Sequence, residues 1–482
     1  MAIKFFNTLS GKKEEFKPLQ EGKVGIYLCG PTVYDEPHIG HARSAYVFEV
    51  IRRYFQFKGY KVRFVRNVTD VDDKIINKAR EQESSDDIAR ICEEIAEKYY
   101  NIYSLWMSKM GISPPDIEPR ATEHIPEMQE LISTLIHKGY AYVVDGDVYF
   151  RVKKFKDYGR LSRRSVDEMI AGARIEPGEK KEEPLDFALW KKAKPQEPSW
   201  DSPWGRGRPG WHIECSVMST GYLGVPFDIH CGGIDLIFPH HENEIAQSQA
   251  ASGEEFARYW LHNGLLTING QKMAKSLGNF ITVEQVLTRY HPDVLKLFFL
   301  TTNYRSPIDF TWEKLDELAE AKEKFDSFLS RTKRIKRVHF SSRAESRNNY
   351  SEELNQFRQK FIQAMDDDFN TAVALGVLYE IVNLGNRILE DVSFSFVEKN
   401  ILLSEIRQTL LEFGKIFCLF LQASDDEGYN QLVEKVIAIR EILRKEKRFE
   451  LADRIREELM SLGIVIEDGK DKTTWRKGAK VR

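Results

Sequence analysis

The sequence predicts an α/β protein in which an insertion divides a parallel sheet and a helical C-terminal region follows. Three observations predict this class. A strand–helix–strand pattern opens the chain, an irregular segment rich in Lys, Glu, Pro and Trp runs from about 153 to 210, and nearly everything beyond Trp312 is charged and helix-patterned. Because a strand, a helix and a second strand in this order build parallel sheets, we expect a Rossmann-like domain in two halves.

The opening strand–helix–strand unit covers residues 23–68. The run "KVGIYLCG" is predicted to be a buried strand, and "YKVRFVRNV" is predicted to be a second one. Between them, a Lys58-Gly59 pair marks the expected end of a helix. The apolar residues of this segment follow the spacing of one helix face: Val47, Val50, Ile51, Tyr54 and Phe55.

Further elements follow in order along the chain. Two long helical patterns occupy 84–111 and 122–139, and "YAYVVDGDVYFRV" is a hairpin candidate with Asp145-Gly146 in its turn. Strand and helix signals resume in "FDIHCGGIDLIFPHHENEIAQSQA", after the insertion. We therefore expect an irregular insertion between the two halves of the sheet.

The composition is that of a soluble globular protein. Of 482 residues, 42% are hydrophobic and 30% are charged, and the formal net charge is −3. Five cysteines at irregular spacing argue against a disulfide scaffold and for a reducing cytoplasm. We expect neither a signal peptide nor a membrane-spanning segment. A nucleic-acid partner would have to use local basic patches.

Reactive side chains gather where the first strand meets the first helix. Cys29 ends the strand, and His38 and His41 flank Ile-Gly at the helix start. A helix N-terminus offers free backbone N–H groups to phosphate, and two imidazoles there could hydrogen-bond the same anion. The alternative is that these histidines cap the helix or pack at a domain seam.

A metal site is the second hypothesis. His240 and Glu244 are four residues apart on a predicted helix, so they face the same way. With Cys29 and Cys215 they would complete a tetrahedral zinc set. The spacing leaves rivals open: His241 with Glu244, His240 with Glu242, and Cys231 as a ligand. It also leaves open that the two cysteines are buried small hydrophobes, as Cys92 and Cys418 are expected to be.

A lysine-bearing loop is the third candidate. Lys272 and Lys275 flank Met-Ala between Gly270 and Gly278. Ammonium groups beside flexible glycines suit a loop that closes over polyphosphate. The alternative is a solvated basic turn.

Taken together, these stretches resemble a known family. His-Ile-Gly-His (38–41) and Lys-Met-Ala-Lys-Ser (272–276) are similar to the two signature motifs of class I aminoacyl-tRNA synthetases. The resemblance to the cysteinyl-tRNA synthetase family covers nearly the whole chain, through "YLCGPTVYDEPHIGHARS", "RNVTDVDDKI", "GRPGWHIECS", "FPHHENEIAQS" and "LADRIREELMSLGIVIEDGKDKTTW". One departure is Ala274, where the signature usually has Ser, and it puts the loop's hydrogen bonding in question.

The resemblance implies a two-step ligase. It would condense L-cysteine with ATP and Mg²⁺ to cysteinyl-adenylate, then move the cysteinyl group to the terminal ribose of tRNA(Cys). One Zn²⁺ per chain, on Cys29, Cys215, His240 and Glu244, would select the substrate thiol over the hydroxyl of serine. The implied partners are thus tRNA(Cys), ATP and L-cysteine, and we expect a cytoplasmic monomer.

The resemblance also assigns roles to residues. Catalytic roles fall to His38, His41, Lys272 and Lys275. Contacts to ATP fall to His38, Gly40, His41, Gly233, Asp235 and Lys275, although Gly233 and Asp235 could form a simple turn. The amino-acid pocket would include Gly30, Thr69, Trp211 and His230, with core packing open for Trp211 and strand capping open for Thr69.

The C-terminal end is implied to read the anticodon. Trp475, Arg476 and Lys477 suit stacking and phosphate contacts with unpaired nucleotides, and a disordered charged tail is the alternative. The expected domains are the two halves of the catalytic domain and four further parts: 1–135 and 206–265 for the halves, 136–205 for the insertion, 266–335 for the signature loop and stem contacts, 336–420 for a helical bundle, and 421–482 for anticodon binding.

Two other functions compete. A related ligase activates cysteine but joins it to an amino sugar, and it lacks the anticodon-binding end. A degenerate paralogue would bind tRNA or zinc without catalysis, which the intact His38, His41, Lys272 and Lys275 disfavour.

Overall fold

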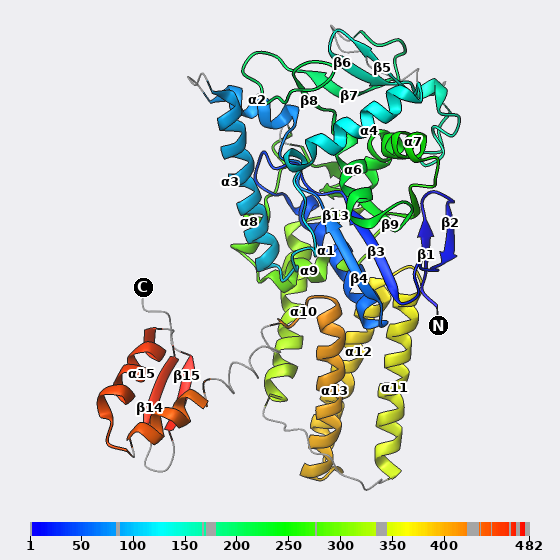
Figure 1. The fold of residues 1–482 in the computed structure, drawn as a ribbon. Helices are drawn as coiled ribbons and strands as arrows, with labels where there is room; N and C mark the ends of the chain where they lie inside the picture. Colours follow the sequence, from blue (N-terminus) through cyan, green and yellow to red (C-terminus); the bar gives the residue numbers. More distant parts are fainter. Residues whose placement is uncertain are drawn as a thin grey trace. The chain divides into compact units, whose positions relative to one another are not determined.

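The computed structural model forms two compact units, Met1–Leu419 and Phe420–Arg482 (Figure 1). It describes residues 2–82, 87–165, 168–169, 180–274, 277–333, 345–421, 433, 435–444, 446–461, 464–468 and 473–477. The unit boundary lies beside the predicted start of the last domain. The predicted domain boundaries stay a prediction.

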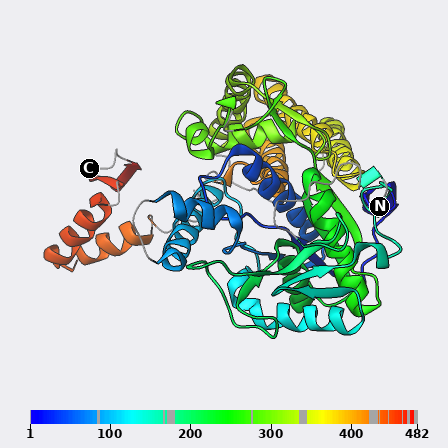
Figure 2. The same cartoon turned by 90° about the horizontal axis from the view of Figure 1, so that it is seen from above.

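A four-stranded parallel sheet organises the larger unit. Its strand order is β10-β9-β3-β4, with β3 at Lys23–Leu28, β4 at Lys61–Arg66, β9 at Phe227–Gly233 and β10 at Ala257–Asn263. Helix α1 (Ile39–Phe57) connects β3 to β4, which confirms the predicted strand–helix–strand unit. The two halves of the sheet domain, blue and green in Figure 2, lie side by side although the insertion separates them in sequence.

The topology places a site at the carboxyl ends of β3 and β9. From β3 the chain moves to β4 on one side, and from β9 it moves to β10 on the other. Such a switch point opens a crevice outside the strand ends, where ligands bind in α/β proteins. Further helical segments of this domain are α2 (Asp73–Glu81), α3 (Ile88–Lys109), η1 (Ala121–His124), α4 (Ile125–His137), α6 (Trp211–Leu223), η3 (Ile234–Leu236), η4 (Ile237–His241) and α7 (Glu242–Ser252).

The insertion is more regular than predicted. It forms an antiparallel sheet of order β5-β6-β7-β8, built from Ala141–Val144, Asp147–Phe150, Phe187–Lys192 and Gly207–Pro209. The β5–β6 pair confirms the predicted hairpin, but the expectation of an irregular 153–210 was wrong for β7 and β8. These short strands depend on pairing with β6, far away in the chain, so local periodicity does not reveal them.

Small elements not foreseen in the sequence complete the sheet domain. The N-terminal hairpin pairs β1 (Lys4–Asn7) with β2 (Lys12–Glu15). A second small sheet of order β12-β11-β13 combines Leu266–Ile268 (β11), Gln271–Lys272 (β12) and Ile308–Phe310 (β13). The short helical segments η2, α8 and α9 span Val152–Lys154, Val283–Leu287 and Pro292–Leu300.

Long helices follow the sheet domain, as predicted. They are α10 (Trp312–Arg331), α11 (Glu345–Asp366), α12 (Thr371–Glu390) and α13 (Phe396–Ile416), and α11, α12 and α13 pack together (Figure 1). By length and composition α12 would suffice to cross a membrane, contrary to expectation. Half of its apolar window is buried, however, and it packs against both neighbours, which is the position of a core helix.

The smaller unit contains strands in a region that was predicted to be nearly all helical. Helix α15 (Phe449–Ser461) precedes an antiparallel pair, β14 (Ile464–Asp468) and β15 (Thr473–Lys477). The helix-patterned reading beyond Trp312 was therefore wrong for these two strands. Ile464 and Ile466 of β14 alternate into a small core, a period-two signal too short to stand out in a charged segment.

A buried lysine fixes the end of the helical bundle to the sheet domain. Lys296 on α9 pairs with Asp293 at 2.6 Å, and its ammonium also donates to the carbonyl of Cys418. Both charged side chains are buried. The hydroxyl of Tyr46 on α1 donates to the neighbouring carbonyl of Phe417 at 2.8 Å. The turn after α13 is thus held by two elements of the sheet domain.

Cys92 and Cys418 are both buried, as expected.

We expect Lys296→Met to lower the free energy of unfolding by about 3 kcal/mol, because the buried Asp293 carboxylate loses its lysine. Urea unfolding followed by near-UV circular dichroism measures the loss. The control is Lys360→Met, which breaks an exposed pair with Glu380 and should cost less than about 1 kcal/mol. Equal losses of unfolding free energy in the two variants would contradict the stabilising role given to the buried Lys296–Asp293 pair.

Candidate active site

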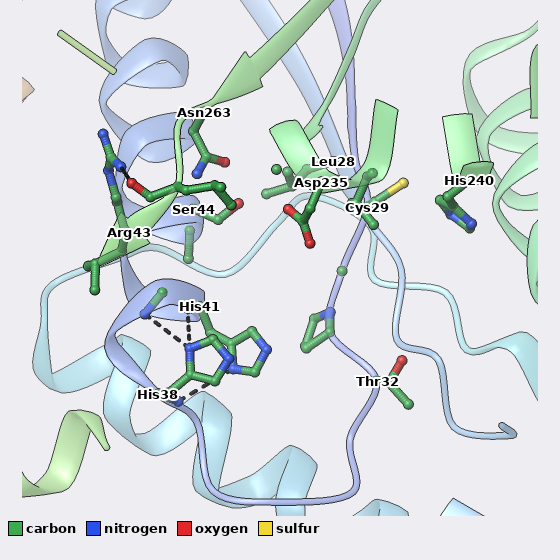
Figure 3. Close-up of a pocket in the computed structure, with 18 of the residues that line it drawn as sticks. Leu28, Cys29, Thr32, His38, His41, Arg43, Ser44, Asp235, His240 and Asn263 are labelled. Carbon is green, nitrogen blue, oxygen red and sulfur yellow. Dashed lines mark hydrogen bonds between the residues drawn. The ribbon is translucent and has the colours of Figure 1, made fainter. Parts of the chain in front are cut away.

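A cavity of about 450 Å³ opens at the carboxyl ends of β3, β9 and β10 (Figure 3). Its lining comes from the start of α1, from α2 and α6, and from β11 and β12. Most predicted site residues line it: Cys29, Gly30, His38, Gly40, His41, Thr69, Trp211, Cys215, Gly233, Asp235, His240 and Lys272. His230 and Glu244 are buried beside this cavity, and Lys275 lies outside the described residues.

The four predicted zinc ligands converge in space. Cys29 follows β3, Cys215 lies on α6, His240 in η4 and Glu244 on α7, and one ligand atom from each lies within 4.8 Å of the others. The two sulfurs are 3.7 Å apart, and Cys29 Sγ is 3.6 Å from Glu244 Oε1. Tetrahedral zinc with Zn–S bonds of about 2.3 Å separates two sulfurs by roughly 3.8 Å. The donor set therefore fits zinc.

A second grouping shares two of these ligands. Cys29 and Glu244 also lie within 4.8 Å of His230 and His241, with His241 Nε2 at 3.3 Å from Cys29 Sγ. His230 is already bonded to the other carboxylate oxygen, Glu244 Oε2, at 2.9 Å. The first grouping offers two thiols, the ligands that soft metals prefer. The distances alone leave His240 and His241 as rivals.

The other rival ligands do not reach the cluster. Cys231 is buried on β9 and belongs to neither grouping found among the described residues. Glu242 accepts hydrogen bonds from the backbone N–H groups of Gly159 at 3.0 Å and Ser162 at 2.7 Å. Its carboxylate holds the 159–162 loop, so the pairing of His240 with Glu242 is not formed.

Electrostatics prepares the cluster for a cation. Burial raises the pKa of Glu244, but the adjacent His230 and His240 outweigh it and lower that pKa to about 2. The hydrogen bond from Cys29 lowers the pKa of Cys215 to about 6 against the effect of burial. Burial, followed by the hydrogen bond and charge of Cys215, raises the pKa of Cys29. At neutral pH, Cys215 and Glu244 are thus anionic, and the raised pKa of His240 makes its imidazole the balancing cation.

Aromatic and imidazole rings position His240. Burial lowers the pKa of His240, but the charge of Glu244 and the hydrogen bond with Cys215 outweigh it and raise that pKa to about 10. The Trp211 ring stacks on His240 with centroids 4.1 Å apart, and His212 Nδ1 lies 3.0 Å from His240 Nδ1. Trp211 is 37% exposed and faces the cavity, which excludes the core-packing reading for it.

Asn67 organises the neighbouring strand ends. Its side chain accepts from the Gly30 N–H at 2.8 Å and donates to Thr69 Oγ1 at 3.2 Å. A Cβ at Gly30 would lie 1.6 Å from the Asn67 carbonyl oxygen, so the close approach requires glycine. Thr69 Oγ1 in turn donates to Glu214 Oε2 at 3.1 Å. Asn67 and Glu214 support the predicted pocket, although neither was singled out in the sequence.

His38 and His41 form a stacked pair at the start of α1, with centroids 3.7 Å apart (Figure 3). His38 Nδ1 accepts from the N–H groups of Gly40 and His41, and His41 Nδ1 accepts from the His38 N–H. The capping alternative is therefore correct. Because Nδ1 accepts on both neutral rings, the proton of each ring is on Nε2, and that N–H group can still donate to an anion. Capping and anion binding are thus compatible.

The two imidazoles are neutral in this environment. Burial, and then the charge of Lys74, lowers the pKa of His38 to about 4. Burial, His38 and Lys74 lower the pKa of His41 as well. At pH 7 they can donate hydrogen bonds, but they carry no positive charge to oppose phosphate.

Gly233 and Asp235 lie at the end of β9. Asp235 belongs to the η3 turn and lines the cavity, where Figure 3 shows its carboxylate among the other lining side chains. A Cβ at Gly233 would lie 2.4 Å from Asp235 Oδ1, so glycine lets the carboxylate fold back onto the strand end. The turn predicted as the alternative is present, and it directs Asp235 into the cavity.

The lysine-bearing loop is braced by Asn279. Its Oδ1 accepts from the backbone N–H of Ala274 at 2.8 Å, and its Nδ2 donates to the Lys272 carbonyl at 3.1 Å. Ala274 thus contributes its backbone to this brace, so replacing the usual Ser keeps both bonds.

The predicted tRNA contacts lie in the smaller unit. Trp475 on β15 is half-buried and packs against the cluster that contains Val433, Ile437 and Leu459. This packing gives Trp475 a structural role whatever it binds. Arg476 and Lys477 belong to the same strand, but their side chains lie outside what the structure describes.

Comparisons with known proteins find family models and relatives that match nearly the whole chain. A family model described as "tRNA synthetases class I (C) catalytic domain" matches residues 15–320, a "DALR domain" matches 360–422, and a "Cysteinyl-tRNA ligase anticodon binding domain" matches 426–476. The cysteine–tRNA ligase of Persephonella marina is 50% identical, with 99% of this chain and 100% of the relative covered. The cysteine–tRNA ligase of Aquifex aeolicus is 47% identical, with 99% of both chains covered.

Solved structures support the fold. A methionyl-tRNA synthetase from Mycobacterium tuberculosis superposes with a TM-score of 0.59 at 15% identity, covering 82% of this chain and 89% of the other. An Agrobacterium radiobacter LeuRS gives a TM-score of 0.61 at 12% identity, covering 84% and 85%. The full-length sequence matches and the catalytic-domain match lead to one assignment. The chain belongs to the cysteine–tRNA ligase family and is a class I aminoacyl-tRNA synthetase.

Proposed function

We propose that the chain ligates L-cysteine to tRNA(Cys) through a cysteinyl-adenylate. The observation that carries the proposal is a single cavity. Its lining includes residues of a group of possible metal ligands with two thiols, and also the start of α1, where backbone and imidazole N–H groups can bind phosphate. The family supplies the overall reaction, and the cavity supplies a place for each small substrate. Cysteine would lie towards Cys29 and Trp211, and ATP towards His38 and His41.

The metal cluster would set the amino-acid specificity. Cys29, Cys215, His240 and Glu244 would hold one Zn²⁺, and His230 and Trp211 would keep Glu244 and His240 in position. Zinc bound there supplies a soft Lewis acid that binds the thiolate of cysteine and matches the hydroxyl of serine poorly. Gly30 and Thr69 would border the same subsite, where Asn67 fixes the strand ends.

The start of α1 would bind the triphosphate. Neutral His38 and His41 would donate their Nε2–H groups to phosphate oxygens, and Gly40 keeps the backbone close because a Cβ there would meet the His38 ring at 2.8 Å. Lys272 and Lys275 would oppose the charge on the phosphates, and Gly233 and Asp235 would hold the ribose. Mg²⁺ accompanying ATP would neutralise part of the remaining charge.

The smaller unit would recognise the anticodon, with Trp475, Arg476 and Lys477 as candidate contacts. The match of residues 426–476 to an anticodon-binding domain supports this role. The same match weighs against the alternative function, the ligase that joins cysteine to an amino sugar, because that ligase lacks the anticodon-binding end. We expect the enzyme to act as a cytoplasmic monomer.

Removing one metal ligand should abolish cysteine activation. We expect Cys29→Ser to lose zinc and to reduce cysteine-dependent ATP–pyrophosphate exchange by more than about 100-fold. Zinc content by elemental analysis and the exchange rate are the two measurements. Cys231→Ser, a buried free cysteine outside the cluster, is the matched control and should keep its zinc. Full activity in Cys29→Ser would remove this residue from the ligand set.

The brace of the lysine-bearing loop should matter more than the residue at 274. We expect Asn279→Ala to slow adenylate formation by about 10-fold or more, because misplaced catalytic groups lose orientation. Ala274→Ser should stay within about 2-fold of the parent enzyme, because the brace uses its backbone. Single-turnover adenylate formation measures both. The interpretation fails if Ala274→Ser changes the rate more than Asn279→Ala.

The smaller unit should serve only the tRNA step. A chain that ends at Leu421 retains the sheet domain, the bundle and the turn held by Lys296. We expect unchanged pyrophosphate exchange and strongly reduced cysteinylation of tRNA(Cys), measured with the same preparation. Wild-type kcat/KM for tRNA in the shortened chain would refute the anticodon role.

A further inference from the structure

The cavity contains more positive charge than the two signature motifs supply. Four basic residues among the described lining come from four different elements or strand ends: Arg43, Arg66, Lys74 and Lys272. Asp235 is the one acidic residue in that lining. A cavity with this imbalance suits a polyanion. Lys74 belongs to the "RNVTDVDDKI" stretch, and neither its spacing nor the proposed function gives it a role.

Two of the four basic side chains, Arg43 and Arg66, are already hydrogen-bonded to other groups of the protein. Arg43 donates to the carbonyls of Gly264, Leu265, Tyr304 and Ser306, at 2.7, 2.8, 3.3 and 2.6 Å. Arg66 is bonded to Glu118 at 2.6 Å and to the hydroxyl of Tyr103 at 3.3 Å. Their geometry is that of structural groups, so they have little freedom to follow a reacting phosphate.

Lys74 differs from these arginines. Its side chain is exposed, and its ammonium lies 5.4 Å from the centroid of the Tyr34 ring, which also lines the cavity. Within the described part of the chain it forms no ion pair. Lys78, one turn further along α2, is instead paired with Asp35 at 3.4 Å.

Lys74 lines the same cavity as the histidine pair of the helix start. Its charge contributes to the lowered pKa of both His38 and His41. The two histidines provide neutral donors, and Lys74 provides the charge that they lack. A phosphate bound to the imidazole Nε2–H groups would therefore lie within the field of this ammonium.

Helix α2 holds Lys74 in place. Asp72 caps the helix by accepting from the Lys74 N–H at 2.8 Å. Asp73 pairs with Lys191 at 2.8 Å and also with Arg208, which fixes the helix start to β7 and β8. At the other end, Arg80 pairs with Glu197 at 2.7 Å. These anchors reduce the cost of presenting the ammonium to a ligand.

We propose that Lys74 is a further phosphate-binding catalytic residue, which contacts the β- and γ-phosphates of ATP and stabilises the departing pyrophosphate. The inference rests on the proposed function. In the adenylation step a carboxylate oxygen of cysteine bonds to the α-phosphorus, while the bond from that phosphorus to the bridging oxygen breaks. Pyrophosphate leaves with the electron pair, so negative charge grows where Lys74 is placed.

The test is ATP–pyrophosphate exchange with Lys74→Met, Lys74→Arg and the unaltered enzyme. We expect Lys74→Met to lower kcat/KM for ATP by about 10- to 100-fold and to raise KM for inorganic pyrophosphate, as loss of a charged hydrogen bond would. KM for cysteine should stay unchanged, and Lys74→Arg should restore most of the rate because it keeps the charge. The thermal midpoint should not move, since the side chain is exposed.

Lys98→Met is the matched control. Lys98 is an exposed lysine on α3 whose ammonium also lies over a tyrosine ring, at 5.1 Å from the centroid of Tyr99, and it does not line the cavity. It should exchange like the unaltered enzyme. If Lys74→Met matches Lys98→Met, the proposal is wrong.

Three further outcomes are informative. A loss confined to tRNA cysteinylation, with a raised KM for tRNA, would assign Lys74 to a tRNA phosphate and overturn the proposal. A loss at pH 6 that vanishes at pH 8 would mean that Lys74 acts only by keeping His38 and His41 neutral, and would also overturn it. Absence of cysteine-dependent exchange in the unaltered enzyme would instead reject the proposed function.

Discussion

The buried cluster of Cys29, Cys215, His240 and Glu244 places the strongest constraint on this structure. Two thiols and a carboxylate packed together away from water need positive charge beside them, from the His240 imidazole or from a bound metal ion. The cluster needs a strand end, two helices and the η4 turn to meet at one point, and the order of the parallel sheet brings them there. The close approach at Gly30 and the hydrogen bonds of Asn67 hold the strand ends in that arrangement.

Helix α1 connects this constraint to the rest of the molecule. Its first residues carry the capped histidine pair, and one turn later Arg43 holds four backbone carbonyls of the facing loops. Tyr46 then reaches the turn that ends α13, where Lys296 also donates. One helix therefore sets the position of the anion-binding donors, the cavity wall and the end of the helical bundle.

Sequence patterns were sufficient where the signal is local. The period of the apolar residues predicted α1, the runs "KVGIYLCG" and "YKVRFVRNV" predicted its flanking strands, and His-Ile-Gly-His located the helix start. They were insufficient for β7, β8, β14 and β15, because short strands depend on partners that the local pattern does not contain. The choice between His240 and His241 also stayed open. The spacing argument assumed that His240 and Glu244 share one α-helix, whereas α7 begins at Glu242 after η4, and both imidazoles lie at the cluster. Lys74 could not be found from spacing at all, since only the packed fold brings it into the cavity that the histidines line.

X-ray absorption at the zinc edge tests the central claim most directly. In the enzyme alone the account predicts two sulfur ligands at about 2.3 Å, with nitrogen and oxygen completing the set. Saturating L-cysteine should raise the number of sulfur ligands to three, and L-serine should leave it at two. A sulfur count that does not change with cysteine, or a metal bound without sulfur, would contradict selection of the substrate thiol at this cluster.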